Sequence, residues 1–370
     1  MELLSDEYTF ETVYPINELR LWHVPEGEAL YNFAISRSWT SFTNWVVRHF
    51  PEPIFKQREK KTQKMFERHI ERMSPDLIIS VTPFINYPGI KAAEAHGLPF
   101  ILVTTDNDLK TWSTSLEKQN YSQFKVTIGY DLPTSKGLLL DKNVPEESIE
   151  TIGLPLRPSF LEPHSRKDLR HKYEIPDGKK VVLIMMGGVG AKSSYQYAKA
   201  IGENSLNMHM IVCAGKSSHA AAKFKKIKLA KGNTMDLIPF TEKIHELFYL
   251  SDLLLTKSGP GTMNEAFAAK LPILIDQTNE SLFWEKPNID LVLSKKVGAC
   301  VHSYKEAPEL VKRYLYDEEM RETIAQAYED VEQNQFAERI KPLIEELCGE
   351  PATGEVQLAS RSMATSPFAP

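Results

Sequence analysis

A glycine-bearing turn at residues 256–266 is the stretch of the sequence best suited to bind an anion. Leu253–Leu255 have the pattern of a short apolar strand, and Gly259 and Gly261 open the turn that precedes the next helix. Glycines let a ligand's phosphates approach the backbone, and the free N–H groups of a helix's first turn attract negative charge. Glu265 lies further along that helix, where a carboxylate suits a pair of sugar hydroxyls. The alternative is an ordinary strand–helix turn with a solvated glutamate.

A second glycine cluster spans residues 187–190, after a predicted strand at 181–186. A Walker A loop needs a glycine directly before its lysine, and Ala191 stands there instead. A dinucleotide fingerprint needs a third glycine where Ser193 stands, and no acidic residue closes the following strand near Cys213. The cluster does suit a diphosphate cradle. Two such turns in one domain can hold a nucleotide diphosphate from two sides.

Asp106-Asn107-Asp108 follows a predicted buried strand at 100–104. Such a DxD pattern can hold a divalent metal against a diphosphate, but a loop with capping aspartates is the preferred interpretation. Because functional groups of parallel sheets gather at the carboxyl ends of strands, Asp106 remains a candidate catalytic base or acceptor-positioning group. GxSxG, HExxH and paired CxxC motifs are absent, and the ten histidines have no ligand spacing, so no metal site is predicted.

Alternating helices and short apolar strands must position these residues, which predicts an α/β fold with doubly wound parallel sheets. A turn-rich passage at 153–158 reads as the interdomain linker. The expected division is an N-terminal domain at 1–157, a C-terminal domain at 158–348 and a disordered tail at 349–370. Buried strands are expected at 77–81, 100–104, 126–128, 149–152, 181–186, 210–213, 237–240, 253–255, 271–275 and 299–301, and helices over 51–73 and 305–347.

Composition sets the outer limits. A length of 370 residues predicts two or three domains, and a net charge of −5 gives no reason to expect a nucleic-acid partner. Cys213, Cys300 and Cys348 are odd in number and lack CxxC spacing, which predicts reduced thiols in a cytosolic protein. No apolar run approaches the roughly 20 residues of a membrane-spanning helix, and the N-terminus lacks the basic region of a signal peptide.

Aromatic residues gather between residues 31 and 50, with two arginines among them. Aromatic rings beside arginines suit the boundary between lipid headgroups and acyl chains, so a monotopic membrane contact is one hypothesis. The alternative is a partly buried loop packed on a domain. The residues concerned are Tyr31, Phe33, Trp39, Phe42, Trp45, Phe50, Arg37 and Arg48.

The sequence resembles the monogalactosyldiacylglycerol synthase and diacylglycerol glucosyltransferase family, which is related to the N-acetylglucosaminyltransferase that forms lipid II. The similarity covers most of residues 1–345. It is carried by residues 256–266, by Tyr31-Asn32-Phe33 with Trp39, by Pro75–Pro83, by Thr104-Thr105-Asp106, by Gly153-Leu154-Pro155, by Gly187–Gly190 and by Glu285-x-x-Asn288.

The resemblance implies a GT-B architecture: two Rossmann-like domains that face each other across a cleft, with a UDP-sugar on the C-terminal domain and a lipid acceptor on the N-terminal one. By resemblance, Glu265 binds the ribose and Phe240 lies beside the uracil. Glu285 and Asn288 address the hexose. Beside these roles, Asp106 could take the proton from the acceptor hydroxyl or orient that hydroxyl. No metal cofactor is implied. The residues expected at the diphosphate are Gly187, Gly188, Gly190, Gly259, Gly261 and Thr262, and Ser258 is also expected to bind the donor.

The chain departs from the family at its start, where members have a strand and a Ser-x-Gly-x-Gly-His loop that this sequence lacks. We expect either a start codon assigned too late or a remnant that binds donor without efficient turnover. The leading hypothesis is transfer of a hexose from a UDP-sugar to a diacylglycerol-type lipid by a cytoplasmic, peripherally membrane-associated enzyme. The alternatives are a nucleotide-sugar-binding protein with little catalysis and a nonhydrolysing UDP-sugar epimerase.

Overall fold

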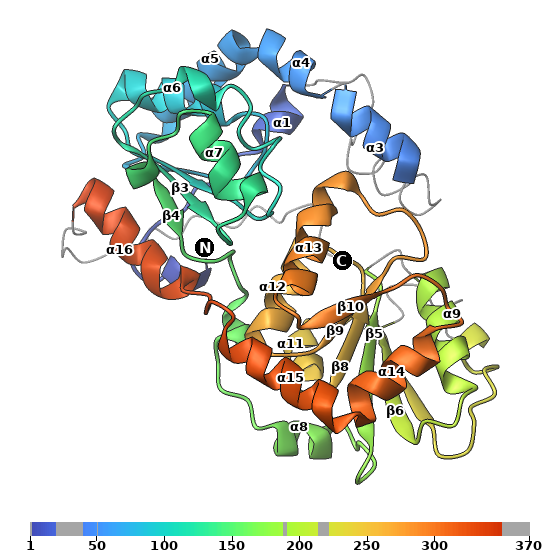
Figure 1. Cartoon of the computed structure of the whole chain (residues 1–370). Helices are drawn as coiled ribbons and strands as arrows, with labels where there is room; N and C mark the ends of the chain where they lie inside the picture. The colour runs from blue at the N-terminus through green and yellow to red at the C-terminus, as the bar shows by residue number, and fades with distance from the viewer. Residues whose placement is uncertain (1, 20–39, 50, 188–190, 214–221, 350–370) are drawn as a thin grey trace.

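The computed structural model describes residues 2–19, 40–49, 51–187, 191–213 and 222–349, and it contains two parallel sheets with helices around each (Figure 1). The first sheet has the order β1-β2-β3-β4, with every pair parallel. Its strands lie where the buried apolar runs predict them. They are β1 (Ile78–Ser80), β2 (Phe100–Val103), β3 (Phe124–Ile128) and β4 (Ile149–Thr151).

Helices accompany the first sheet on either side of its strands. The longest, α5 (Glu59–Met73), buries Met65, Phe66 and Ile70 along one stripe, and it ends at Ser74 in the left-handed conformation. The others are α1 (Pro15–Glu18), α3 (Thr40–His49), α4 (Pro51–Gln57), α6 (Asn86–His96) and α7 (Leu138–Asp141), with short helical turns η1 (Glu2–Leu4), η2 (Leu116–Lys118), η3 (Pro133–Gly137) and η4 (Glu146–Ser148).

The second sheet has the order β10-β9-β8-β5-β6-β7, again with every pair parallel. Counted from β5, this is the strand order 3-2-1-4-5-6 of a Rossmann fold, whose order reverses between β5 and β8. The second α/β series therefore forms a doubly wound unit, whereas the described strands of the first sheet follow the chain order from β1 to β4 without a reversal. The strands are β5 (Lys180–Met185), β6 (Met208–Cys213), β7 (Thr234–Ile238), β8 (Leu253–Thr256), β9 (Ile273–Asp276) and β10 (Gly298–Val301).

β8 and β9, at the centre of the second sheet, are buried along their whole length, and β5 is buried except at its two end residues, because helices cover both faces of the sheet. The interior side chains form one continuous apolar core. The helices of this unit are α8 (Arg166–Lys172), α9 (Ala191–Gly202), α11 (Ile244–Leu250), α12 (Pro260–Ala268), α13 (Lys286–Ser294), α14 (Ala307–Tyr316) and α15 (Glu318–Glu329), with the turns η5 (Pro158–Phe160) and η6 (Phe283–Glu285).

The last helix, α16 (Phe336–Cys348), returns to the first domain (Figure 1). Its buried residues Phe336 and Ile340 belong to the same apolar cluster as Ile101 and Val103 of β2. The expected division placed this segment in the domain at 158–348, whereas the structure packs it on the first sheet. Its apolar stripe shows that one face is buried but not which sheet buries it. The boundary near residue 157 stays a prediction, and residues 350–370 of the expected tail lie outside the described residues.

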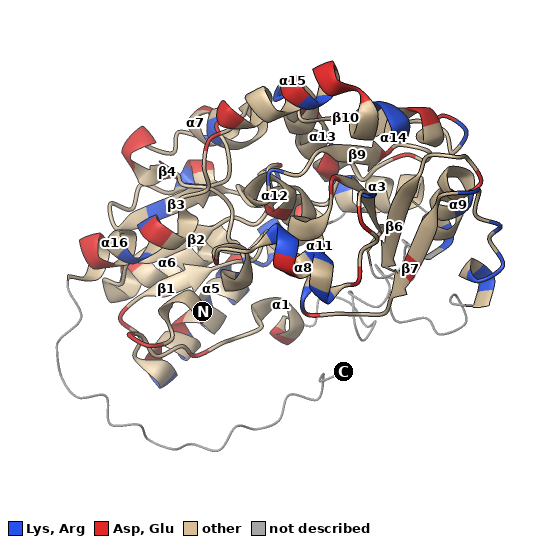
Figure 2. Ribbon diagram, turned by 90° about the horizontal axis from the view of Figure 1, so that it is seen from below, with Lys and Arg blue, Asp and Glu red and all other residues tan. Residues whose placement is uncertain are grey.

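Basic and acidic residues are interspersed along the ribbons of both domains (Figure 2). The expectation of no nucleic-acid partner remains a prediction. Within the described ranges, no helix is both long enough and apolar enough to cross a bilayer.

Candidate active site

The strands that lead into the two glycine clusters, β5 and β8, end side by side in the second sheet. β5 and β8 are hydrogen-bonded neighbours, with Met185 opposite Thr256 in the register. Adjacent strands lie about 4.8 Å apart, so Gly187 and Ser258 emerge together at the carboxyl edge, at the point where the strand order reverses. This is where open α/β sheets bind ligands. The structure thus brings Gly187 to the turn at 256–266, while Gly188 and Gly190 lie outside the described residues.

The start of α12 offers an open, glycine-lined approach to the backbone. Gly259 is its N-cap, with no side-chain cap, and Gly261 and Thr262 follow in the first turn. A Cβ atom built at Gly259 or Gly261 would meet no atom within 4 Å, and the Gly259 backbone angles suit any residue. The fold therefore does not require glycine at either position. A ligand that approaches these N–H groups closely would require it.

Ser258, Glu285 and Asn288 form one hydrogen-bonded group beside this turn. The Ser258 hydroxyl donates to a Glu285 carboxylate oxygen at 2.9 Å, and the Asn288 amide donates to the Ser258 carbonyl at 2.8 Å. Burial raises the pKa of Glu285, against the opposing effects of the Ser258 hydroxyl and the Lys257 charge. Lys257 is a residue that the sequence reasoning did not single out, although it stands inside the quoted motif.

Asn288 is fully buried, and its hydrogen bonds connect the two domains. Its Oδ1 accepts a hydrogen bond of 2.9 Å from Asn107 of the first domain, while its Nδ2 is held by Ser258. Both polar groups of the side chain are thus engaged within the protein. Direct contact of Asn288 with a hexose stays a prediction. Asn107 was considered only as part of the DxD pattern.

Replacing Asn288 by alanine is expected to cost about 1–3 kcal/mol in the free energy of unfolding, because the Asn107 amide and the Ser258 carbonyl would lose a buried partner. Denaturant unfolding measures this cost. Asn107→Ala should cost a similar amount, and the double variant should be less destabilised than the sum of the two. Additive costs would show that the bond contributes nothing to stability.

Asp106 faces this group from the first domain. It follows β2, and its carboxylate accepts the Asn107 backbone N–H at 2.8 Å. Burial raises the pKa of Asp106 to about 7, and the negative charges of Asp108 and Glu285 add to that rise, while backbone N–H groups oppose it. The hydrogen bond from Asn107 to Asn288 places the Asp106 loop beside α13, the helix that follows Glu285. A group with a pKa near neutrality is suited to take up a proton.

Glu265 is buried on α12 and forms an ion pair with Arg157 of the interdomain linker, Oε1 to Nη2 2.8 Å. Burial raises the pKa of Glu265, and the guanidinium opposes that shift. Arg157 is half exposed. Sequence reasoning noted the linker motif that contains Arg157 but did not assign the arginine a role, because the ion pair joins positions more than 100 residues apart.

Phe240 lies just beyond β7 at the same carboxyl edge and is 63% exposed. Thr262 is half-buried in the first turn of α12.

Among the described residues, no group of three or more His, Cys, Asp or Glu side chains is placed to hold a metal ion.

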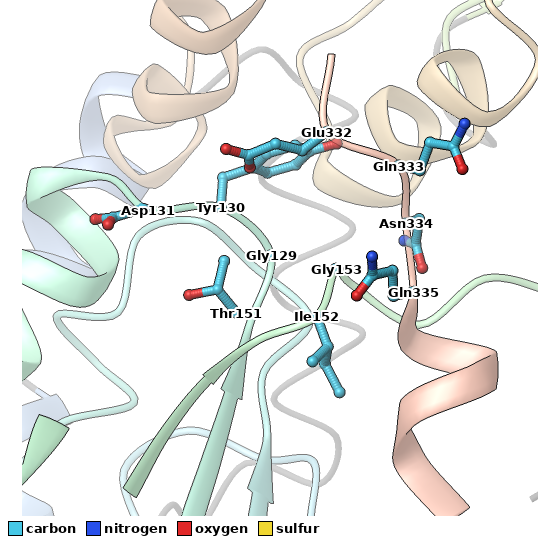
Figure 3. Close-up of a pocket in the computed structure, with 10 residues that line it drawn as sticks. All are labelled: Gly129, Tyr130, Asp131, Thr151, Ile152, Gly153, Glu332, Gln333, Asn334 and Gln335. Carbon is cyan, nitrogen blue, oxygen red and sulfur yellow. The ribbon is translucent and has the colours of Figure 1, made fainter. Parts of the chain in front are cut away.

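A separate cavity of about 410 Å³ lies at the interdomain crossing, beside the linker and the segment that leads into α16 (Figure 3). None of the predicted site residues lines it. Tyr130 and Glu332 flank it, and burial together with the Glu332 charge raises the pKa of Tyr130. The cavity is therefore distinct from the glycine turns.

Comparison with known proteins bears on the second domain most directly. Residues 181–346 match the glycosyltransferase family 28 C-terminal domain. The chain is 26% identical over 269 residues to the processive diacylglycerol beta-glucosyltransferase of Bacillus subtilis (strain 168), covering 72% of this chain and 66% of that protein. It is 27% identical over 329 residues to the chloroplastic monogalactosyldiacylglycerol synthase 1 of Arabidopsis thaliana, covering 83% and 57%. The chain thus spans less than two thirds of each relative.

The crystal structure of Acinetobacter baumannii MurG shares the fold, with a TM-score of 0.58 and 15% identity over 79% of each chain. In this chain the GT-B architecture comprises the two parallel sheets, with the last helix α16 packed on the first of them. The part of the chain that carries the switch-point turn, Glu265, Glu285 and Asn288 lies within the segment that matches the glycosyltransferase family 28 C-terminal domain, and the fold of the chain is GT-B.

Proposed function

We propose that this protein transfers a hexose from a UDP-sugar to a diacylglycerol-type lipid. The observation that carries the proposal is that β5 and β8, the strands that lead into the two glycine clusters, are neighbours at the switch point of the second sheet. The hydrogen bond between Asn107 and Asn288 brings the Asp106 loop of the first domain beside this edge. Relatives named for diacylglycerol glycolipid synthesis support the acceptor class. Fold likeness alone does not separate this activity from epimerisation, because two Rossmann-like units serve many reactions.

The residues present suit such a transfer. Backbone N–H groups of α12 and the positive end of its dipole stabilise the negative charge that builds on the departing diphosphate. The bond between the hexose and the diphosphate breaks as the acceptor oxygen bonds to the hexose. Asp106 takes the hydroxyl proton of the acceptor. Glu285, which accepts the Ser258 hydroxyl beside the glycine turn, would address the transferred sugar.

A diacylglycerol acceptor resides in a bilayer, so we place the protein peripherally on a membrane surface. Phe42 and Trp45 of α3 are 56% and 52% exposed and support this placement. Tyr31, Phe33, Arg37, Trp39 and Phe50 of the aromatic segment lie outside the described residues. Free thiols at Cys213, Cys300 and Cys348 suit a cytoplasmic location.

The decisive experiment incubates the full chain with radiolabelled UDP-glucose or UDP-galactose and diacylglycerol in mixed micelles. Labelled glycolipid is the expected product. Donor binding without a lipid product would favour the nucleotide-sugar-binding alternative. Interconversion of the UDP-sugar without an acceptor would favour the epimerase.

Replacing Glu265 by glutamine is expected to weaken UDP binding about tenfold, because a charged acceptor for the ribose hydroxyls is lost. The wild-type protein should prefer UDP to 2′-deoxy-UDP, and the variant should lose that preference. Calorimetry with both nucleotides measures the effect, and thermal unfolding checks that Arg157, left without its carboxylate, does not disturb the fold. An unchanged preference would show that Glu265 does not contact the ribose.

A further inference from the structure

Helix α3 extends from the first domain to the second, where it lies beside the loop that leads into η6 (Figure 1). Its residues Ser41, Asn44 and Arg48 share one face, at helical spacing. Asn44 is only 7% exposed, although it belongs to a helix that is otherwise largely accessible. A buried carboxamide in such a place must be hydrogen-bonded.

Asn44 holds the loop at three points. Its Nδ2 donates to the Glu280 carboxylate at 3.2 Å and to the Ser281 carbonyl at 3.1 Å, and its Oδ1 accepts the Phe283 N–H at 3.0 Å. The Arg48 guanidinium adds a contact 5.0 Å from the centroid of the Phe283 ring. One side chain of the first domain therefore fixes the backbone of this second-domain loop.

The same loop delivers Glu285 to the candidate site. Phe283 opens η6, and the Glu285 N–H closes it by donating to the Leu282 carbonyl at 2.9 Å. Glu285 then accepts the Ser258 hydroxyl. At its other end the loop is tied by Gln277, whose amide donates to the Ser281 hydroxyl at 2.5 Å. A displacement at Asn44 would therefore shift Glu285 relative to the glycine turn.

We propose that Asn44 is a positioning residue for the donor-sugar loop 280–285, and that α3 thereby couples contact with a lipid surface to the hexose site. The neighbouring face of α3 presents Phe42 and Trp45, stacked with ring centroids 6.3 Å apart and both more than half exposed. An aromatic pair next to Arg48 suits the headgroup boundary of a bilayer. The inference rests on the proposed function, since a lipid acceptor brings α3 to that boundary.

The role of Asn44 can be tested by exchanging the amide and the carboxylate between positions 44 and 280. Asn44→Asp sets a carboxylate against Glu280, so the loop is expected to move away and the transfer rate to fall about tenfold or more. UDP affinity should stay unchanged, because the glycine turns are untouched. Glu280→Gln in the same chain gives the new aspartate an amide donor and should restore most of the rate. Unchanged transfer in Asn44→Asp, or no rescue by Glu280→Gln, would overturn the positioning role.

The double variant Phe42→Ser/Trp45→Ser tests the part of the proposal that concerns contact of α3 with a lipid surface. On phosphatidylcholine–phosphatidylglycerol vesicles that carry diacylglycerol, its transfer rate should fall about tenfold or more, because the apolar area that enters the bilayer is lost. On a soluble short-chain diacylglycerol its rate should equal that of the wild type, whereas Asn44→Asp should be slow on both. An unaltered rate on vesicles would overturn the coupling. Absence of any glycolipid product from the wild type would instead defeat the proposed function itself.

Discussion

Replacing Gly261 by alanine is expected to abolish tight UDP binding without weakening the fold. The added methyl group enters open space at the start of α12, so it meets no protein atom within 4 Å. Alanine favours a helix over glycine by up to about 1 kcal/mol, so the free energy of unfolding should stay level or rise. The same methyl group would occupy the space through which a diphosphate reaches the backbone N–H groups.

The expected loss in affinity follows from the hydrogen bonds at stake. A hydrogen bond to a charged group contributes about 1.5–3 kcal/mol, so the loss of one raises Kd about ten- to hundredfold. Calorimetry with UDP measures the affinity, and denaturant unfolding measures the stability.

Gly137→Ala is the matched control for Gly261→Ala. Gly137 lies at the start of α7 in the first domain with helical backbone angles, and an added Cβ would find only ordinary contacts there, the nearest at 3.7 Å. This variant should keep full UDP affinity. Normal UDP binding by Gly261→Ala would mean that the start of α12 is not where the diphosphate binds.

Asp106→Asn is expected to slow transfer about 10²- to 10⁴-fold while UDP binding persists, because general-base assistance to the acceptor hydroxyl is lost. In the wild type the carboxyl must be ionised to accept a proton, and burial raises its pKa to about 7. Hence kcat/KM should rise with pH through about 7, and this limb should disappear in the variant.

The same ionisation should affect the free energy of unfolding in the opposite direction. Stability should fall as the pH rises, whereas kcat/KM should increase. A carboxyl whose pKa is raised on folding stabilises the native state below its unfolded pKa of about 3.9, and that contribution is lost as pH rises through about 7. The amide introduced by Asp106→Asn carries no charge at either pH. The unfolding free energy of the variant minus that of the wild type should therefore be larger at pH 8 than at pH 5. Chemical denaturation at the two pH values measures this difference.

Asp108→Asn is the matched control for Asp106→Asn, since burial also raises the pKa of Asp108 but its carboxylate caps the Lys110 N–H within the same loop. Its transfer rate should remain close to wild type. A pH limb that persists in Asp106→Asn would assign the ionisation to another group, with Glu285 the nearest candidate.

The site residues that could be predicted from the sequence are those that stand in a strong local pattern. Gly259 and Gly261 stood between an apolar strand and a helix, and Asp106 stood directly after a buried strand, so each could be placed at a strand's carboxyl end. Asn288 was predicted to contact the hexose. In the structure its side chain bonds both Asn107 and Ser258 and so connects the two domains. Arg157, Asn107 and Asn44 act through partners distant in the sequence, and no local pattern marks them.

The sequence by itself determined the alternation of strands and helices, the two α/β series and the glycine turns, because hydrophobic periodicity and turn chemistry are local properties of the chain. Only the tertiary structure decided that β5 and β8 are neighbours, that α16 returns to the first sheet, and that Asn44 and Asn107 reach the second domain. These features depend on which surfaces bury one another across long stretches of chain, and that choice is made by packing of the whole molecule.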